Sequence, residues 1–372
     1  MPGAPRAGLG FTIVVTVLSV LGAGLMMLVL AMTSAPAILF LAAALAALPV
    51  GPLVGGYLWL DRYEPEPRAL LIAGLVWGGF VATAAALVLQ GIGFMAGLGD
   101  DTSLAVVAPV TEEASKGLFL FLLLWWRRHE LDGILDGIVY AGMVGIGFAF
   151  VENILYLAAA YNGTDGMGPG GTTALTTTFV VRCLASPFAH PLFTSFTGIG
   201  VGIAVATRSR AVRWLAPIGG YLLAVVAHGT WNGSTIYGPH GFIGIYAVVM
   251  APAFLSLVAF AIWSRRSERR MLTAALGDAA ARGLLPATDI GWVVDLTARR
   301  RARRWARDNG GTAAERAMRD YQQAAIELGF LHHRYLRGTP PPDFAARGQA
   351  YVARIAAARP HISFPGQVVP TR

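Results

Sequence analysis

Long apolar runs separated by short polar segments dominate residues 1–263 of this chain. A bilayer core about 30 Å thick needs about 20 apolar residues in helical form. Backbone groups in hydrocarbon must bond within their own segment, so such runs form helices rather than strands. The pattern therefore predicts an all-α, polytopic transmembrane bundle of about eight helices. The eight runs lie at about 11–32, 36–60, 69–96, 103–126, 134–160, 178–207, 214–236 and 241–263.

Several of these runs carry further local signals. The first, from Phe11 to Met32, is longer than the 7–15 apolar residues of a signal peptide, so we expect an uncleaved span. The sixth contains Pro187 and Pro191, which remove backbone donors and predict an interrupted helix. Glycines repeat at four-residue spacing, which predicts close helix packing. These pairs are Gly51 and Gly55, Gly133 and Gly137, and Gly198 and Gly202.

Positive charge alternates along the connecting segments. The loops between the positive ones contain no Lys or Arg and carry Asp100, Asp101 and Asp165. Cytoplasmic loops are the ones enriched in Lys and Arg. We therefore expect a multi-pass plasma-membrane protein with an even number of spans and both termini in the cytoplasm. The positive segments hold Arg6; Arg62 and Arg68; Arg127 and Arg128; Arg208, Arg210 and Arg213; and Arg265, Arg266, Arg269 and Arg270.

Residues 264–372 form a second, basic region without an apolar span. It holds 19 arginines against nine acidic residues, whereas only 13% of the whole chain is charged. Segments near 312–337 and 343–358 have amphipathic helical patterns, so we expect a basic, helical cytosolic tail. The dense run Arg299–Arg304 is typical of a solvated helix face or of a contact with anionic lipid headgroups. It lacks any recognised nucleic-acid-binding module, so we expect no nucleic-acid partner.

Ionisable residues interrupt four consecutive apolar runs, the fourth to the seventh. Each would cost about 2.5–3.5 kcal/mol at mid-membrane, so together they must face the bundle interior, where they can pair, bind a metal or meet water. Counted from the predicted helix ends, the carboxylates and imidazoles fall at similar depth, in the outer half of the bilayer. The residues are Glu112, Glu113 and Lys116; Glu152 with Asn153; Arg182 and His190; and His228 with Asn232.

Lys116 is the only lysine of a chain that has 28 arginines. Glu112 precedes it by four residues and Glu113 by three, so both carboxylates can reach the ammonium on one helix face. Two interpretations follow. The three residues form a structural ion pair that anchors the helix, or Lys116 keeps one glutamate ionised while the other performs chemistry.

Short motifs on these runs resemble those of the PrsW family of intramembrane proteases, which is related to the CAAX prenyl endopeptidases. Glu112-Glu113-Ala114-Ser115-Lys116 is similar to the family's EExxK motif, and Phe148 to Glu152 to its FxxxE motif. His228 to Asn232 is similar to HxxxD/N, and His190 stands where the family has another intramembrane histidine. Asp61 to Pro67 resembles the family's second cytoplasmic loop.

The resemblance implies hydrolysis of a peptide bond in a membrane-anchored protein substrate. Carboxylates and imidazoles are typical ligands of a catalytic Zn²⁺ that keeps an open position. On this hypothesis Glu152, His190 and His228 are the metal ligands. Glu113 or Glu112 is the general base, and Lys116 is its electrostatic partner. Asn232 orients His228 or stabilises the oxyanion.

Two alternatives remain open at the level of sequence. The chain has no HExxH motif. The similarity to the CAAX group implies an alternative in which a glutamate activates water without any metal. Buried Glu, Lys and His also form the proton relays of ion-coupled transporters. Transporters typically contain inverted repeats, and the first four runs show no clear echo in the last four.

Overall fold

The computed structural model describes residues 5–63, 65–164 and 168–366. All the regular structure of these residues is helical, and no strand occurs among them. The predicted all-α class is therefore confirmed. Glu64 and Asp165, which entered the loop predictions, lie outside the described residues.

The chain divides into two compact units. The first comprises Met1–Asp61 and Glu66–Phe260, and the second comprises Arg62–Pro65 and Ala261–Arg372. The first unit contains all the intramembrane polar residues singled out above. The second unit contains the basic tail.

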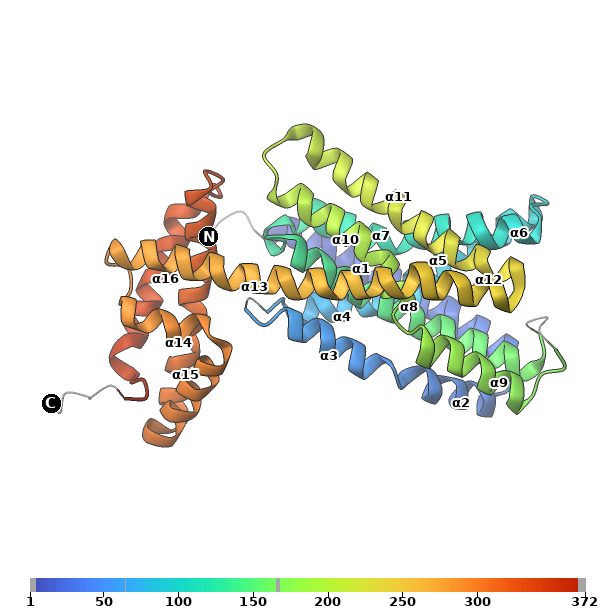
Figure 1. Ribbon diagram of the computed structural model, residues 1–372, viewed down its shortest axis with the longest axis horizontal. Helices are drawn as coiled ribbons and strands as arrows, with labels where there is room; N and C mark the ends of the chain where they lie inside the picture. The colour runs from blue at the N-terminus through green and yellow to red at the C-terminus, as the bar shows by residue number, and fades with distance from the viewer. Residues whose placement is uncertain (1–4, 64, 165–167, 367–372) are drawn as a thin grey trace. The chain divides into compact units, whose positions relative to one another are not determined.

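Apolar helices run side by side through the first unit (Figure 1). Among the described residues, six stretches are long and apolar enough to cross a membrane. They are Gly8–Thr33, Pro36–Leu60, Arg68–Met95, Ile134–Asn162, Thr172–Ala206 and Arg210–Ala281. The predicted count of about eight spans is higher than these six for two reasons. Helix α7 (Ala108–Trp126) carries three charged residues, and the 72-residue stretch turns at Gly238, where φ is +68°.

Several of these stretches are built from consecutive helical pieces. Pro49 separates two of the pieces, and π-helical turns join others. The pieces of the first half are α1 (Pro5–Thr33), α2 (Pro36–Ala47), α3 (Val50–Leu60), α4 (Arg68–Val76), η1 (Trp77–Ala82), α5 (Thr83–Met95), α6 (Asp100–Thr102) and η2 (Ser103–Val107), followed by α7.

The second half of the first unit follows the same plan. The predicted interruption near Pro187 and Pro191 is observed, because the helical path breaks between Ser186 and Phe188. The pieces are α8 (Ile134–Asn162), α9 (Thr172–Phe179), η4 (Val180–Ala185), α10 (Ala189–Ala206), α11 (Arg210–Ser234), α12 (Gly238–Ile245), η6 (Tyr246–Met250) and α13 (Ala251–Ala281). Short 3₁₀ turns lie at Arg128–Glu130 (η3) and Thr235–Tyr237 (η5).

Helix α8 is the core of the first unit. It contacts α2, α3, α4, η1, α7, α9 and α10, and most of its length is buried. Glycines allow the closest approaches. A Cβ at Gly137 would lie 2.0 Å from the carbonyl oxygen of Gly198, and one at Gly202 would lie 2.4 Å from Cα of Ile134. The predicted packing role is thus confirmed at these positions, whereas Gly51 and Gly55 have no atom near a Cβ and do not pack.

The second unit is a small helical domain with its own apolar core. Tyr321 and Phe364 are completely buried in it, and Tyr321 donates a 2.6 Å hydrogen bond to the buried carboxylate of Asp289. Arg359 lies 2.9 Å from the same carboxylate. The helices are α14 (Ile290–Val294), α15 (Leu296–Leu336), which bends at Gly311, and α16 (Phe344–Ala358), with 3₁₀ turns η7 (Ala287–Asp289) and η8 (Arg359–His361).

Candidate active site

Helix α7 carries the two glutamates and the single lysine on its buried face. Lys116 and Glu113 are completely buried, and Glu112 is 5% exposed. The Nζ atom of Lys116 lies 2.7 Å from Oε1 of Glu113 and 3.4 Å from Oε2 of Glu112. The ammonium therefore contacts both carboxylates, as the sequence spacing predicts.

Lys116 also connects α7 to helices α8 and α10. Its Nζ lies 3.0 Å from Nδ1 of His190 and 3.9 Å from the centre of the Phe148 ring. An ammonium only donates, so Nδ1 of His190 accepts and its Nε2 carries the proton. That Nε2 lies 2.7 Å from Oε2 of Glu152. One hydrogen-bonded chain thus runs from Lys116 through His190 to Glu152.

His228 enters the same cluster from helix α11. Its Nδ1 lies 2.9 Å from Oε1 of Glu113, and its ring stacks on Phe193 at 4.7 Å between centres. The hydroxyl of Thr194 donates to the other oxygen of Glu113 at 3.2 Å. A carboxylate that accepts from one histidine nitrogen fixes the orientation of the ring. Glu113 therefore directs Nε2 of His228 toward Glu112, whose Oε2 lies 3.7 Å away.

Glu112, His190 and His228 form a group that could hold a metal ion. Each offers one donor atom within 4.8 Å of the others, and all three residues are buried. One carboxylate and two imidazoles are the ligand set of several catalytic zinc sites, so the donor chemistry fits Zn²⁺. The sequence-based hypothesis named Glu152 as the third ligand. The structure brings Glu112 into this group instead, with Glu152 beside His190.

Arg182, on the π-helical turn η4, is a site residue to which the sequence analysis gave no role. Its guanidinium bonds Glu152, donates to Oδ1 of Asn153 at 2.8 Å, and lies 3.8 Å from the centre of the Tyr156 ring. A cation in an apolar run pairs with an acid or faces water. The presence of Arg182 in an apolar run was therefore a sequence signal from which its pairing with a glutamate could have been predicted.

Gln90 of helix α5 was missed altogether. Its Nε2 donates to Oε1 of Glu112 at 3.2 Å. A single amide in an otherwise apolar span was the only sequence signal. Asn232 was predicted to orient His228 or to stabilise the oxyanion. Its Nδ2 donates to the carbonyl oxygen of Leu104 at 3.1 Å.

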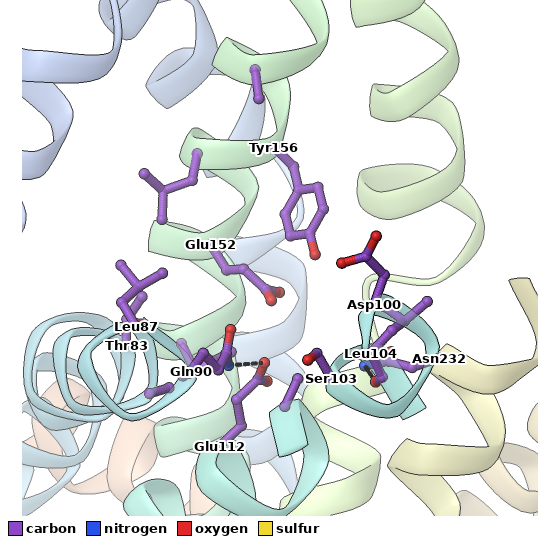
Figure 2. Close-up of a pocket in the computed structure, with 15 residues that line it drawn as sticks. Thr83, Leu87, Gln90, Asp100, Ser103, Leu104, Glu112, Glu152, Tyr156 and Asn232 are labelled. Carbon is purple, nitrogen blue, oxygen red and sulfur yellow. Dashed lines mark hydrogen bonds between the residues drawn. The ribbon is translucent and has the colours of Figure 1, made fainter. Parts of the chain in front are cut away.

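A cavity of about 460 Å³ adjoins the cluster (Figure 2). Glu112, Glu152 and Asn232 line it, whereas Glu113 and Lys116 do not. Figure 2 shows the carboxylates of Glu112 and Glu152 directed into this space. Of the carboxylates in the cluster, Glu112 and Glu152 therefore face the cavity, whereas Glu113 contacts Lys116 and His228.

This fold and this cluster define a class of protein. A bundle of apolar helices encloses carboxylates that can move protons and imidazoles that can hold a metal or a water molecule, and a cavity leads to them. These are the components of a hydrolase whose chemistry takes place within the membrane.

Comparison with known proteins specifies the class further. Residues 66–257 match the family described as "PrsW family intramembrane metalloprotease", which covers more than half of the chain. The chain therefore belongs to the PrsW family of intramembrane proteases. All the site residues described above lie within the matched range.

Individual relatives support this assignment. A protein named Protease PrsW from Geobacillus kaustophilus (strain HTA426) is 28% identical over 193 residues, which are 50% of this chain and 76% of the relative. Another Protease PrsW, from Clostridioides difficile (strain 630), is 32% identical over 117 residues, which are 30% of this chain and 49% of the relative. No solved structure matches the chain significantly.

Proposed function

We propose that this protein hydrolyses a peptide bond of a membrane-anchored protein substrate, at the point where the cavity meets Glu112 and Glu152. One observation carries the proposal: the carboxylates of Glu112 and Glu152 line a cavity, and the buried imidazoles of His190 and His228 lie beside them. A structural ion pair alone needs neither the histidines nor the cavity.

The arrangement supports a separate role for each residue. Glu112, His190 and His228 would hold Zn²⁺, which when bound lowers the pKa of water and polarises the scissile carbonyl. His190 now uses both ring nitrogens, so ligation requires it to exchange Lys116 or Glu152 for the ion. Glu152, held by Arg182, accepts the proton of the attacking water and returns it to the leaving amine.

Asn232 keeps its predicted catalytic role in this proposal. It lines the cavity together with both carboxylates, and one N–H of its amide is used by Leu104. The second N–H remains to donate to the oxyanion that forms on the scissile carbonyl.

A second route uses the same residues without a metal. Glu112 then acts as the general base, with Gln90 and Lys116 fixing its position. The routes differ in their need for zinc. Zinc content of the purified protein and cleavage after chelation distinguish them: full cleavage by metal-free protein contradicts the zinc route and leaves the glutamate route.

Cleavage of single-span test substrates in proteoliposomes tests the proposal itself. We expect Glu152→Gln and Glu112→Gln to reduce the rate about 10²–10⁴-fold, as loss of a general base or a ligand does. Val88→Ala is the matched control, because Val88 lies on α5 near Gln90 and is 51% exposed on the outside of the bundle. Undiminished cleavage by both glutamine variants contradicts the proposal.

An ion-coupled transporter is the competing function, and the chain from Lys116 through His190 to Glu152 is the observation that favours it. A transporter would move protons across sealed vesicles without any substrate protein. Proton flux that disappears in Glu152→Gln, in the absence of any proteolysis, would favour this reading over hydrolysis.

The orientation in the membrane is part of the proposal. We place both termini in the cytoplasm of a plasma-membrane protein, because the arginine-bearing segments alternate with arginine-free ones. The Asp100 end of the cavity then faces the extracytoplasmic side. The substrate segment would be cleaved near that surface.

The basic tail is proposed to contact anionic lipid headgroups. Arg300, Arg301 and Arg304 of the predicted basic run are exposed, whereas Arg299 is buried. Juxtamembrane arginines are worth about 1 kcal/mol each near an anionic surface. Replacement of the three exposed arginines by glutamine should weaken the protection of α15 from hydrogen exchange in anionic vesicles but not in neutral ones.

A further inference from the structure

Apolar and polar side chains both line the cavity. Ala86 and Leu87 of helix α5 and Leu155 of α8 are apolar lining residues, and Thr83 and Gln90 of α5 line the cavity too. Ser103 of η2 also lines it, and the hydroxyl of Tyr156 points toward Asp100. Figure 2 shows the α5 residues facing the Asp100–Leu104 segment across the space, with Glu152 between them.

The size of the cavity restricts what can occupy it. Its 460 Å³ is within the range of small-ligand pockets. An intact helix with side chains is about 10–12 Å wide, so the cavity does not admit one except as a short fragment. A substrate span must therefore unwind locally, and its freed N–H and C=O groups need new partners in place of the helix.

An extended segment fits this lining. Successive side chains of an extended chain point to opposite sides, so one side chain can contact Ala86, Leu87 and Leu155 while its neighbours point away. Ser103 and the Tyr156 hydroxyl can then bond the exposed peptide groups. A charged side chain would lose its hydration against the three apolar residues, and Thr83 and Gln90 of α5 carry no charge to pair with it.

We propose that Ala86, Leu87 and Leu155 form a specificity subsite that accepts an uncharged aliphatic side chain next to the scissile bond of an unwound substrate segment. The inference rests on the proposed proteolytic function. It adds which substrates the site selects. The residues of α5 and α8 would recognise the shape and apolarity of one substrate side chain rather than a charge. Small aliphatic pockets distinguish substrates about 10–200-fold per methylene group.

The test uses one single-span substrate in four versions, with Ala, Leu, Phe or Asp at the residue on either side of the bond that mass spectrometry identifies as cleaved. We expect wild-type protein to cleave the Ala and Leu versions and to reject Asp. Ala86→Phe fills the subsite, and we expect it to lose the Leu version at least 10-fold relative to the Ala version. Val88→Phe, on the lipid-facing side of the same helix, should keep the wild-type preference.

A second variant acts in the opposite direction. Leu87→Ala enlarges the subsite without crowding the core, and we expect it to raise cleavage of the Phe version relative to Leu. Wild-type preference in both Ala86→Phe and Leu87→Ala, with cleavage intact, overturns the subsite and leaves the proteolytic function standing. Absence of cleavage of every version by wild-type protein overturns the proteolytic function, and the subsite with it.

Discussion

At the scale of single residues, Lys116 is the most constrained position of the site. Its ammonium has three polar partners within 3.4 Å and a ring face at 3.9 Å, and no part of the side chain is exposed. A guanidinium is planar and larger, and it donates in a fixed fork. This geometry explains why a chain that otherwise uses only arginine has a lysine here.

Replacing Lys116 should cost both stability and activity. Lys116→Met leaves Glu113 buried without its cation, and breaking a buried pair costs about 3–5 kcal/mol. We expect a clearly lower unfolding temperature in detergent and no cleavage, and Lys116→Arg should not restore either. Arg301→Met is the control, because Arg301 is exposed on α15. An unchanged unfolding temperature for Lys116→Met would show that the ion pair contributes nothing to the fold.

Asp61, in the loop after α3, should make stability depend on pH. Desolvation raises the pKa of this buried carboxyl to about 7, although the backbone N–H of Glu66 donates to it at 2.7 Å. The unfolded chain has an ordinary pKa of about 3.9. The folded state therefore binds the proton more tightly, and its stability falls as the pH rises from about 4 through 7.

Asp61→Asn removes that dependence while keeping an acceptor for the backbone. We expect the variant to gain unfolding temperature relative to wild type as the pH rises from 5 to 8, measured on the full chain in detergent. Asp308→Asn, at an exposed position, should show no such trend. A constant difference between Asp61→Asn and wild type at all pH values would contradict this account.

Much of the candidate site could be predicted at this scale. An ionisable residue in an apolar run must face the bundle interior, where it can pair. The structure brings together Glu112, Glu113, Lys116, His190 and His228 in this way. The sequence could not show which carboxylate faces the cavity. Neighbours on a helix point about 100° apart, so small changes in rotation decide between Glu112 and Glu113.

At the scale of the elements, length and apolarity predicted the helices well. The predicted run 134–160 corresponds to α8 at Ile134–Asn162, and 69–96 corresponds to α4, η1 and α5 at Arg68–Met95. The π-helical turns were not predicted. Each accommodates an extra residue per turn without changing composition, so hydropathy gives no sign of it.

Close glycine contacts make a matched pair of tests for the helix packing. Gly198→Ala places a Cβ 2.2 Å from the carbonyl oxygen of Gly137, which forces α8 and α10 apart. Gly55→Ala meets nothing within 4 Å and gains helix propensity. We expect a lower unfolding temperature for the first variant and an equal or higher one for the second. Equal stability of the two variants would contradict the close packing of α8 on α10.

At the scale of the whole molecule, charge and apolarity are separated along the chain. The arginines concentrate in residues 264–372 and in alternate loops, while the apolar helices carry their few charges inside the first unit. The predicted boundary at residue 263 follows from apolarity and charge along the sequence. The two units of the structure are defined by contacts between residues. The loop 62–65 belongs with the tail by contacts, which no local sequence pattern shows.

Membrane topology is a prediction of this scale. Single cysteines can be introduced after Cys183→Ser, because Cys183 is the only cysteine and is buried. We expect a cysteine at Asp101 to react with an impermeant reagent added to intact cells. A cysteine at Ser209 should react only after the cells are opened. The reverse pattern would place the termini outside.

The π-helical turns predict how the sequences of related proteins differ. Of the four such turns in the part of the chain that the structure describes, three adjoin the site. Turn η1 packs on α8, Asn232 donates to Leu104 within η2, and η4 carries Arg182. A π-helical turn is a regular helix with one residue added. Divergent members of the family should therefore differ at these three turns by single-residue insertions and deletions, within spans that otherwise align without gaps. A lineage lacking the added residue in 180–185 would rotate position 182 by about 100° away from the glutamate that it holds.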